Sequence, residues 1–188
     1  MQSHHKYNEH TACARIVERL EAGENIALIS DAGTPGISDP GFMLSRECRR
    51  AGIDVECLPG PTACIPAIVA SGLPCDRFVF EGFLPPKKGR ATRLAFLAED
   101  PRTVIFYESP KRLARTLRQL AEAFGDAREA AVCREISKLH EEIKKGTLGE
   151  LSAHYELNQA RGEIVIVVNG KETKRKGDHA APEQDPDD

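Results

Sequence analysis

Two patterns of hydrophobic and polar residues alternate along the chain. Apolar residues three or four positions apart indicate amphipathic helices, whereas short continuous apolar runs between turn residues indicate buried strands. The helical spacing, with its caps and breaks, predicts helices over residues 9–22, 40–50, 63–71, 90–98, 110–124 and from 147 onward. The apolar runs predict strands over residues 25–30, 53–58, 78–80, 103–107, 130–134 and 163–168. Strands that alternate with helices predict an α/β protein with mostly parallel sheets.

Local motifs sharpen several of these elements. Ile16, Val17 and Leu20 form one apolar face of the first helix. The spacing of Thr147 and Glu150 is that of a capping box, and Lys144-Lys145-Gly146 predicts a hairpin turn. Residues 163–168 form the most continuous β-branched run and predict a central strand.

A break in the pattern divides the chain in two. Between Gly82 and Gly89, the residues Pro85-Pro86-Lys87-Lys88 interrupt any regular element. We therefore expect two small α/β domains, residues 1–84 and 85–170, with a ligand cleft between them. The first domain has few strands and opens on a helix, so we expect it to be incomplete at its amino-terminal side. Residues 171–188 have almost nothing to bury and are expected to be disordered.

The composition is that of an ordinary globular protein, with 40% hydrophobic and 29% charged residues. No apolar stretch approaches the roughly 20 residues of a membrane span, and the polar first residues lack the apolar core of a signal peptide. These features predict a cytoplasmic protein without a membrane partner. The six cysteines lack C-x-x-C spacing, which indicates small buried hydrophobes and no metal site.

The net charge of −3 gives the chain no general attraction for nucleic acid. Any contact with RNA must therefore use local basic patches, which neutralise phosphates with little sequence selectivity. Two groups of basic residues are candidates: Lys87, Lys88, Arg90 and Arg93, and separately Lys111, Arg112 and Arg115. Each of these charges could equally be a solvated surface residue. Because aromatic residues make up only 5% of the chain, we expect no obvious platform for stacking bases.

A segment of small and polar residues, Ser30 to Gly41, follows the first predicted strand. Ligands of open α/β sheets bind at the carboxyl ends of strands, where glycines allow close approach to the backbone. The carboxylate of Asp31 can accept hydrogen bonds from an amine or a ribose hydroxyl. The alternative is a plain turn in which Asp39-Pro40 begins a helix.

A second strand end carries the sequence Pro59-Gly60-Pro61-Thr62-Ala63. The helix that follows exposes free N–H groups in its first turn, and such groups can bind a carboxylate. The alternative for Thr62 is a simple N-cap without a ligand.

These segments resemble the tetrapyrrole methylase superfamily, and within it the branch of 16S rRNA (cytidine-2'-O)-methyltransferases. The matching blocks are Ser30–Gly41, Pro59–Ala63 with Ala70–Pro74, Phe80–Pro85, Phe106–Leu113, Cys133–Lys138 with Glu141-Glu142, and Gly162–Val165. Family members begin with a strand and a glycine-rich loop, whereas this sequence starts near the family's His-x-x-Asn-Glu segment, here His5 to Glu9. The resemblance therefore implies that half of the donor pocket is missing.

The resemblance implies two α/β domains, an S-adenosylmethionine donor in the cleft and a homodimer. It further implies methyl transfer to the ribose 2'-hydroxyl of a cytidine in 16S rRNA of the small ribosomal subunit, with no metal. The residues that it implies for the donor site are Asp31, Ala32, Gly33, Thr34, Ile37, Thr62, Ala63 and Tyr107. For Tyr107, buried aromatic packing is an equal alternative.

A ribose hydroxyl is a weak nucleophile and gains from a positioned base. Glu108, Glu135 and Lys138 are the catalytic candidates, although each could instead be a structural or RNA-contacting charge. Two other functions stay open. The chain could be a methyltransferase for tetrapyrroles or other small molecules, or a truncated and inactive remnant that only dimerises or binds RNA.

Overall fold

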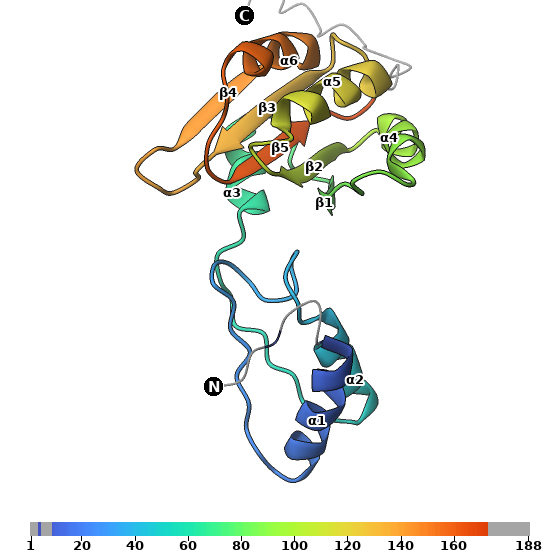
Figure 1. Ribbon diagram of the computed structural model, residues 1–188, viewed down its shortest axis with the longest axis vertical. Coiled ribbons are helices and arrows are strands. Elements are labelled where there is room, and N and C mark those ends of the chain that lie inside the picture. Colours follow the sequence, from blue (N-terminus) through green and yellow to red (C-terminus); the bar gives the residue numbers. More distant parts are fainter. Residues whose placement is uncertain (1–3, 5–8, 173–188) are drawn as a thin grey trace, which may run out of the picture.

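The computed structural model describes His4 and residues 9–172, so the expected disordered tail lies from residue 173 onward outside the described residues. Helices and strands occur in the mixed order expected of an α/β protein (Figure 1). The helices are α1 (Glu9–Glu21), α2 (Phe42–Arg50), α3 (Cys64–Ser71), α4 (Arg90–Ala98), α5 (Leu113–Phe124) and α6 (Leu148–Leu157). The strands are β1 (Phe78–Phe83), β2 (Thr103–Glu108), β3 (Glu129–Arg134), β4 (Glu142–Thr147) and β5 (Ile164–Val168).

The strands form one sheet in the order β1-β2-β5-β3-β4. Among the described strands, only β1 and β2 pair in parallel, whereas β5 is antiparallel to both β2 and β3, and β3 is antiparallel to β4. The α/β class is confirmed, but the expectation of mostly parallel sheets is wrong. Two features account for this: β3 and β4 form a hairpin, and β5 enters between β2 and β3 in the opposite direction to both.

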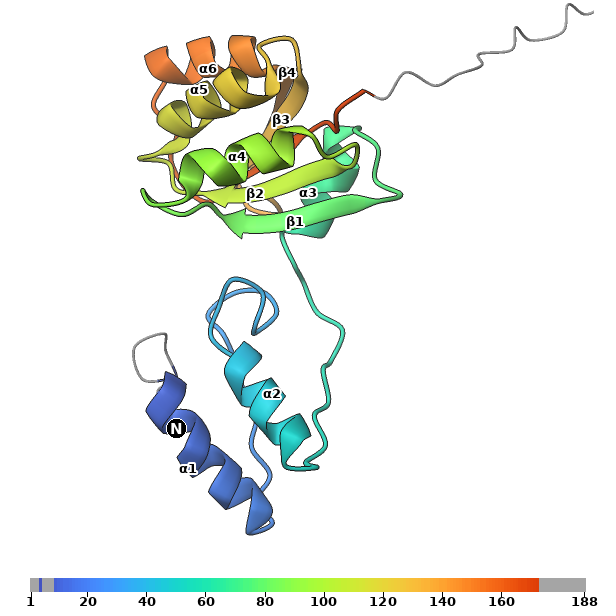
Figure 2. The ribbon, with the colours of Figure 1, turned by 90° about the vertical axis from the view of Figure 1, so that its right-hand side faces the viewer.

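Helices cover the sheet on both faces (Figure 2). On one face, Phe106 of β2 and Ile166 of β5 lie in a core with residues of α4, α5 and α6. The helix residues include Leu94, Leu117 and Leu151. The other face packs against α3 through Ile105, Val167 and Ile68. Every residue of β5 is buried, as expected for a central strand covered on both faces.

The hairpin turn predicted at residues 144–146 is misplaced. Those residues lie inside β4, where Gly146 pairs with Ala130, and residues 135–141 make the turn. Glu135 and Ser137 adopt positive φ values of 49° and 61° there, which lets the chain reverse. The capping box is confirmed, since Thr147 and Glu150 exchange both hydrogen bonds.

The amino-terminal part of the described chain is a pair of packed helices. Ile16 of α1 and Leu44 of α2 are buried between them, with Val17 and Leu20 partly buried beside them, as the helical spacing predicts. Helix α2 begins at Phe42 and not at Pro40. The N–H of Gly41, the residue before it, donates to Oε1 of Glu9 at 3.0 Å.

The strands predicted at residues 25–30 and 53–58 are wrong. In both segments alternate residues pack against the helices, Leu28 and Val55 among them. Ile29 and Leu58 point outward and are 75% and 72% exposed. A strand exists only through ladder hydrogen bonds to a neighbour, and neither segment pairs with any strand of the described chain.

The division expected after residue 84 does not follow the packing. Strand β1 pairs with β2, and α3 packs on β5 and β3, so both elements belong to the carboxyl-terminal sheet. Residues 84–89 are a short connection from β1 to α4. The packing instead changes between α2 and α3, near residues 59–63. Within the described ranges, no helix is both long and apolar enough to cross a bilayer.

Candidate functional site

The glycine-rich segment from Ser30 to Gly41 forms a tight loop. Gly33 and Gly36 have φ values of 80° and 84°, a region that favours glycine, and Ser38 has 65°. The Ser30 hydroxyl donates to the carbonyl oxygens of Ala32 at 3.1 Å and Gly33 at 3.0 Å. Asp31, Ala32 and Gly33 are exposed, as is Ile37 at 40%. Ala32 and Gly33 are therefore accessible to solvent at this position.

Thr34 connects this loop to the second predicted segment. Its hydroxyl donates to the carbonyl of Pro61 at 3.1 Å and lies 3.0 Å from the hydroxyl oxygen of Thr62. The alternative reading of Thr62 as an N-cap is wrong, because the N-cap of α3 is Ala63 and no side chain caps that helix. The two loop segments thus meet, although they are far apart in sequence.

Tyr107, near the end of β2, is hydrogen-bonded to the first residue of α3. Its phenolic oxygen accepts a hydrogen bond from the backbone N–H of Cys64 at 3.2 Å. Its ring contacts that of Phe80 edge to face, with centroids 5.0 Å apart and an interplanar angle of 71°. Burial raises the pKa of Tyr107 to about 12, and the Cys64 thiol and the Asp39 carboxylate add to that increase. Asp39 belongs to the glycine-rich loop, so the loop lies close to the end of β2.

The end of β1 also contacts the loop. A Cβ atom on Gly82, which has a φ of 69°, would lie 3.3 Å from Oγ of Ser38. This contact was not predicted from the sequence, although a glycine inside an apolar strand signals a bulge or a close approach of backbone. We call the assembled set the junction site; it consists of Ala32, Gly33, Thr34, Ser38, Thr62, Ala63, Cys64, Gly82 and Tyr107.

Glu108 follows Tyr107 but points to the opposite face of the sheet. Its carboxylate accepts hydrogen bonds from Ser109 N at 2.8 Å, Arg112 Nε at 2.8 Å and Thr116 Oγ1 at 2.7 Å. The guanidinium of Arg90 lies 3.8 Å away, and the side chains of Arg90 and Glu108 are 7% and 1% exposed. This geometry is that of a buried structural ion pair, the alternative role that the sequence left open for Glu108.

Glu135 and Lys138 lie in the turn between β3 and β4. Lys138 Nζ contacts Glu135 Oε1 at 3.2 Å and Glu163 Oε2 at 3.0 Å. The hydrogen bonds that Lys138 donates to the carboxylates of Glu163 and Glu135 raise the pKa of Lys138, and the hydrogen bond from the backbone N–H of Glu163 lowers the pKa of Glu135. A lysine held protonated is a poor base. The turn begins where β3 ends, and β3 and β2 end on the same side of the sheet with β5 between them. Two strand spacings separate the ends of β2 and β3 by roughly 10 Å.

Several residues of the two predicted basic patches are buried or paired with carboxylates in the structure. Arg90 is buried, where it donates to Gln119 Oε1 at 2.7 Å and to Thr116 Oγ1 at 2.7 Å. Arg93 pairs with Glu81 at 2.8 Å, and Arg112 with Glu108 at 2.7 Å. The exposed members of the two patches are Lys87, Lys88, Arg93, Lys111 and Arg115, and of these Arg93 is held by Glu81. Arg90 is therefore a structural residue, and not part of a surface for RNA.

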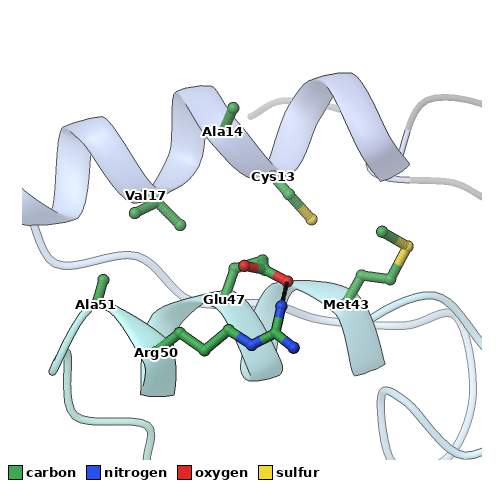
Figure 3. A pocket seen from close by; sticks show the side chains of 7 residues that line it. All are labelled: Cys13, Ala14, Val17, Met43, Glu47, Arg50 and Ala51. Atoms are coloured by element: carbon green, nitrogen blue, oxygen red, sulfur yellow. Dashed lines mark hydrogen bonds and ion pairs between the residues drawn. The ribbon is translucent and has the colours of Figure 1, made fainter.

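Other parts of the structure supply no comparable site. A hollow of about 530 Å³ lies between α1 and α2 (Figure 3), where Glu47 and Arg50 form an ion pair across from Cys13 and Val17. A second, of about 490 Å³, lies between α4 and α5. Neither is lined by a predicted donor-site residue. Among residues 9–172 and His4, no three potential ligands cluster as a metal site requires.

Comparison with known proteins places the chain in a family. Residues 2–152 match the model of the Tetrapyrrole (Corrin/Porphyrin) Methylases. The chain belongs to the tetrapyrrole methylase family. The resemblance found in the sequence is thereby confirmed, and the mixed α/β fold agrees with it.

Two curated relatives carry the name Ribosomal RNA small subunit methyltransferase I. The protein of Xylella fastidiosa is 52% identical over 169 residues, which cover 88% of this chain and 62% of the relative. That of Pseudomonas aeruginosa is 50% identical, over 88% of this chain and 60% of the relative. The chain thus spans about three fifths of the length of these relatives.

A solved structure supports the tetrapyrrole methylase fold. Uroporphyrin-III C-methyltransferase from Thermus thermophilus, complexed with S-adenyl homocysteine, superposes with a TM-score of 0.59 at 18% identity. The superposition covers 86% of this chain and 73% of the other. At that identity the similarity concerns the fold alone.

Proposed function

We propose that this chain acts in the S-adenosylmethionine-dependent 2'-O-methylation of a cytidine ribose in 16S rRNA of the small ribosomal subunit. The observation that carries the proposal is the junction site, where exposed backbone of Ala32 and Gly33 adjoins the Thr34–Thr62 hydroxyl pair and the first turn of α3. Two relatives at 50% identity or more are named as methyltransferases of the small-subunit rRNA, which supports the same reaction.

The residues of the junction site suit the methionine end of the donor. Ala63 is exposed at the start of α3, a helix without a side-chain cap, and N–H groups at such a position attract a carboxylate. The open backbone of Ala32 and Gly33 allows close approach of the amine, with Asp31 beside it. Ile37 offers an exposed apolar contact from the same loop. When bound, S-adenosylmethionine supplies an electrophilic methyl group.

The chain's own part in the reaction is chiefly to hold the acceptor ribose. Positioning of reacting groups can supply most of the acceleration of a displacement reaction. Because burial raises the pKa of Tyr107 to about 12, its phenol stays protonated near neutral pH and can donate a hydrogen bond. Tyr107 is thus suited to orient the ribose or the donor, and not to remove a proton.

The proposal includes two partners and a compartment. Lys87, Lys88, Lys111 and Arg115 are exposed cations that suit rRNA phosphates. We further propose a homodimer in the cytoplasm, where small ribosomal subunits are assembled. The dimer follows from the resemblance to the ribosomal branch, and the compartment from the rRNA substrate.

Binding of S-adenosylmethionine and methyl transfer test this proposal in sequence. Calorimetry with the full chain is expected to give micromolar affinity for the donor. Labelled methyl should then appear on a cytidine ribose of small ribosomal subunits that lack the modification. Label that enters only tetrapyrroles would favour the small-molecule alternative, and absence of heat at millimolar donor would favour an inactive remnant.

A further inference from the structure

Strand β1 contains a bulge that changes which side chains face the junction site. Phe78, Val79 and Phe80 pair in regular register with Thr103, Val104 and Ile105 of β2. The register then shifts, so that Gly82 pairs with Phe106 and Phe83 with Tyr107. One extra residue is therefore inserted between Phe80 and Gly82, and such bulges re-aim the side chains that follow them.

The bulge determines the face on which Phe83 lies. Without it, Gly82 would pair with Tyr107, and Phe83 would pair with Glu108 on the face covered by α4 and α5. With it, Phe83 shares the face of Tyr107, and the two rings meet edge to face with centroids 5.7 Å apart and an interplanar angle of 70°. Phe80, Phe83 and Tyr107 thus form an aromatic group at the ends of β1 and β2.

Phe83 is the open member of this group. It is 52% exposed, whereas Phe80 and Tyr107 are partly buried against the α3 side of the sheet. The other exposed phenylalanines of the described chain, Phe42 and Phe96, each lie under an arginine guanidinium at 5.3 Å. Among the described residues, no guanidinium covers Phe83 in this way. The exposed face of the Phe83 ring is therefore not covered by an arginine of the described chain.

The surroundings of Phe83 suit a nucleotide. The adjacent Gly82 lies against Ser38 of the glycine-rich loop, so the ring borders the junction site. The exposed cations Lys87 and Lys88 follow a few residues later in the connection to α4. Proteins that hold an unpaired base combine an exposed aromatic ring with basic residues for the backbone phosphates, and the segment from Phe83 to Lys88 offers both.

We propose that Phe83 is the stacking surface for the base of the nucleotide whose ribose enters the junction site. This inference rests on the proposed function, since it names the residue that positions the RNA acceptor at the same site. The occupant is a single-stranded pyrimidine nucleotide of RNA. The sequence offers no obvious platform for stacking bases, because the aromatic group forms only where the bulge brings Phe83 to the face of Tyr107.

The test uses the full chain and three variants, Phe83→Leu, Phe83→Trp and Phe96→Leu. The probe is a short single-stranded RNA with a fluorescent pyrrolocytidine at the target position, whose emission is quenched when the base stacks. Phe83→Leu keeps an apolar side chain but removes the aromatic face, and Phe96→Leu makes the same change on α4. Affinity for S-adenosylmethionine is measured by calorimetry for each protein.

We expect Phe83→Leu to lose the quench and to weaken RNA binding by about tenfold, the effect of removing one stacked base. Phe83→Trp should retain both, and Phe96→Leu should match the original chain. Donor affinity should be unchanged in all three variants. Equal losses in Phe83→Leu and Phe96→Leu, or a loss of donor affinity in Phe83→Leu, would overturn the stacking assignment.

The two proposals fail separately in this experiment. A quench that depends on Phe83, in a chain that transfers no methyl group, supports the stacking surface and rejects the methylation. Methyl transfer that Phe83→Leu leaves unchanged supports the methylation and rejects the stacking surface. A probe that is not quenched by the original chain also rejects the stacking surface.

Discussion

The phenolic oxygen of Tyr107 accepts a hydrogen bond from the backbone N–H of Cys64 at 3.2 Å and so ties the end of β2 to the first turn of α3. The hydroxyl of Tyr155 on α6 is in the opposite situation, because it is buried without a hydrogen-bond partner among the described residues. The two tyrosines therefore form a matched pair, in which removal of the same hydroxyl should have opposite effects.

Replacement of Tyr107 by phenylalanine should lower the free energy of unfolding by about 1 kcal/mol, because the Cys64 N–H loses its acceptor. The same change at Tyr155 should be neutral or raise the free energy by up to about 1 kcal/mol, because an unpaired hydroxyl no longer has to be buried. Urea denaturation of both variants measures the difference. Equal destabilisation would contradict the hydrogen bonding of both residues.

The same tyrosines should make the fold sensitive to alkali. Burial raises the pKa of Tyr107 and of Tyr155 to about 12, whereas an unfolded tyrosine titrates near its ordinary value of about 10. The unfolded chain therefore releases these protons first. The contribution to stability is complete below about pH 10 and is lost as the pH rises to about 12. Urea denaturation at a series of pH values measures this loss. Between about pH 10 and pH 12, the free energy of unfolding should fall less steeply with pH for the variant in which both tyrosines are replaced by phenylalanine.

Glu108 should matter for stability before it matters for catalysis. Replacement by alanine leaves the buried guanidinium of Arg90 without its carboxylate, and loss of one partner of a buried pair costs about 3–5 kcal/mol. Glu24→Ala, which breaks the exposed pair with Arg19, should cost far less, because solvent screens that pair. Thermal or chemical denaturation compares the two. A Glu108→Ala chain that is as stable as Glu24→Ala would restore Glu108 as a catalytic candidate.

The glycine-rich loop is tested by Gly33→Val with Gly52→Val as its control. Both glycines have positive φ, 80° and 73°, so a β-branched residue strains the backbone at either place. A Cβ on Gly33 would lie at ordinary contact distance, 3.5 Å from the Pro61 carbonyl oxygen, so strain and the added methyl groups should do the damage. Gly33→Val is expected to weaken the binding of S-adenosylmethionine by about tenfold or more. Gly52→Val should leave that affinity unchanged, and calorimetry measures both.

The six free cysteines should separate into two classes. Cys57 and Cys75 are exposed, whereas Cys13, Cys48, Cys64 and Cys133 are buried. Burial raises the pKa of the Cys133 thiol to about 11, which keeps it protonated and unreactive. A thiol reagent at neutral pH should modify two groups rapidly in the folded chain, and the other four only after denaturation. Rapid modification of more than two would contradict the packing around α1 and the sheet.

The sequence is sufficient for elements whose signal is local. The helices and β5 were predicted from the spacing of their own apolar residues, and the capping box at Thr147 needs only four residues. Sheet partners are not local, so the direction of β5, the membership of β1 and the absence of ladders at residues 25–30 and 53–58 could not be predicted in this way. The alternation along β2 could have separated Tyr107 from Glu108, since neighbours on a strand face opposite sides.

The candidate site divides in the same way. Thr34, Thr62 and Tyr107 were chosen from motifs, and the fold brings them together with the exposed backbone of Ala32 and Gly33. Ser38 and Phe83 were missed, because their positions depend on the loop that approaches β1 and on the bulge in that strand.

Strand β5 is the last of the strands in the described residues, yet it lies between β2 and β3. While the chain is being synthesised, β2 and β3 therefore each have one edge without a hydrogen-bonded neighbour until residues 164–168 have left the ribosome. Exposed edges invite pairing with other chains, and contacts between distant residues form slowly. We therefore expect nascent or proteolysed chains that end before β5 to aggregate, so a single central strand determines when the polypeptide becomes safe from misassembly.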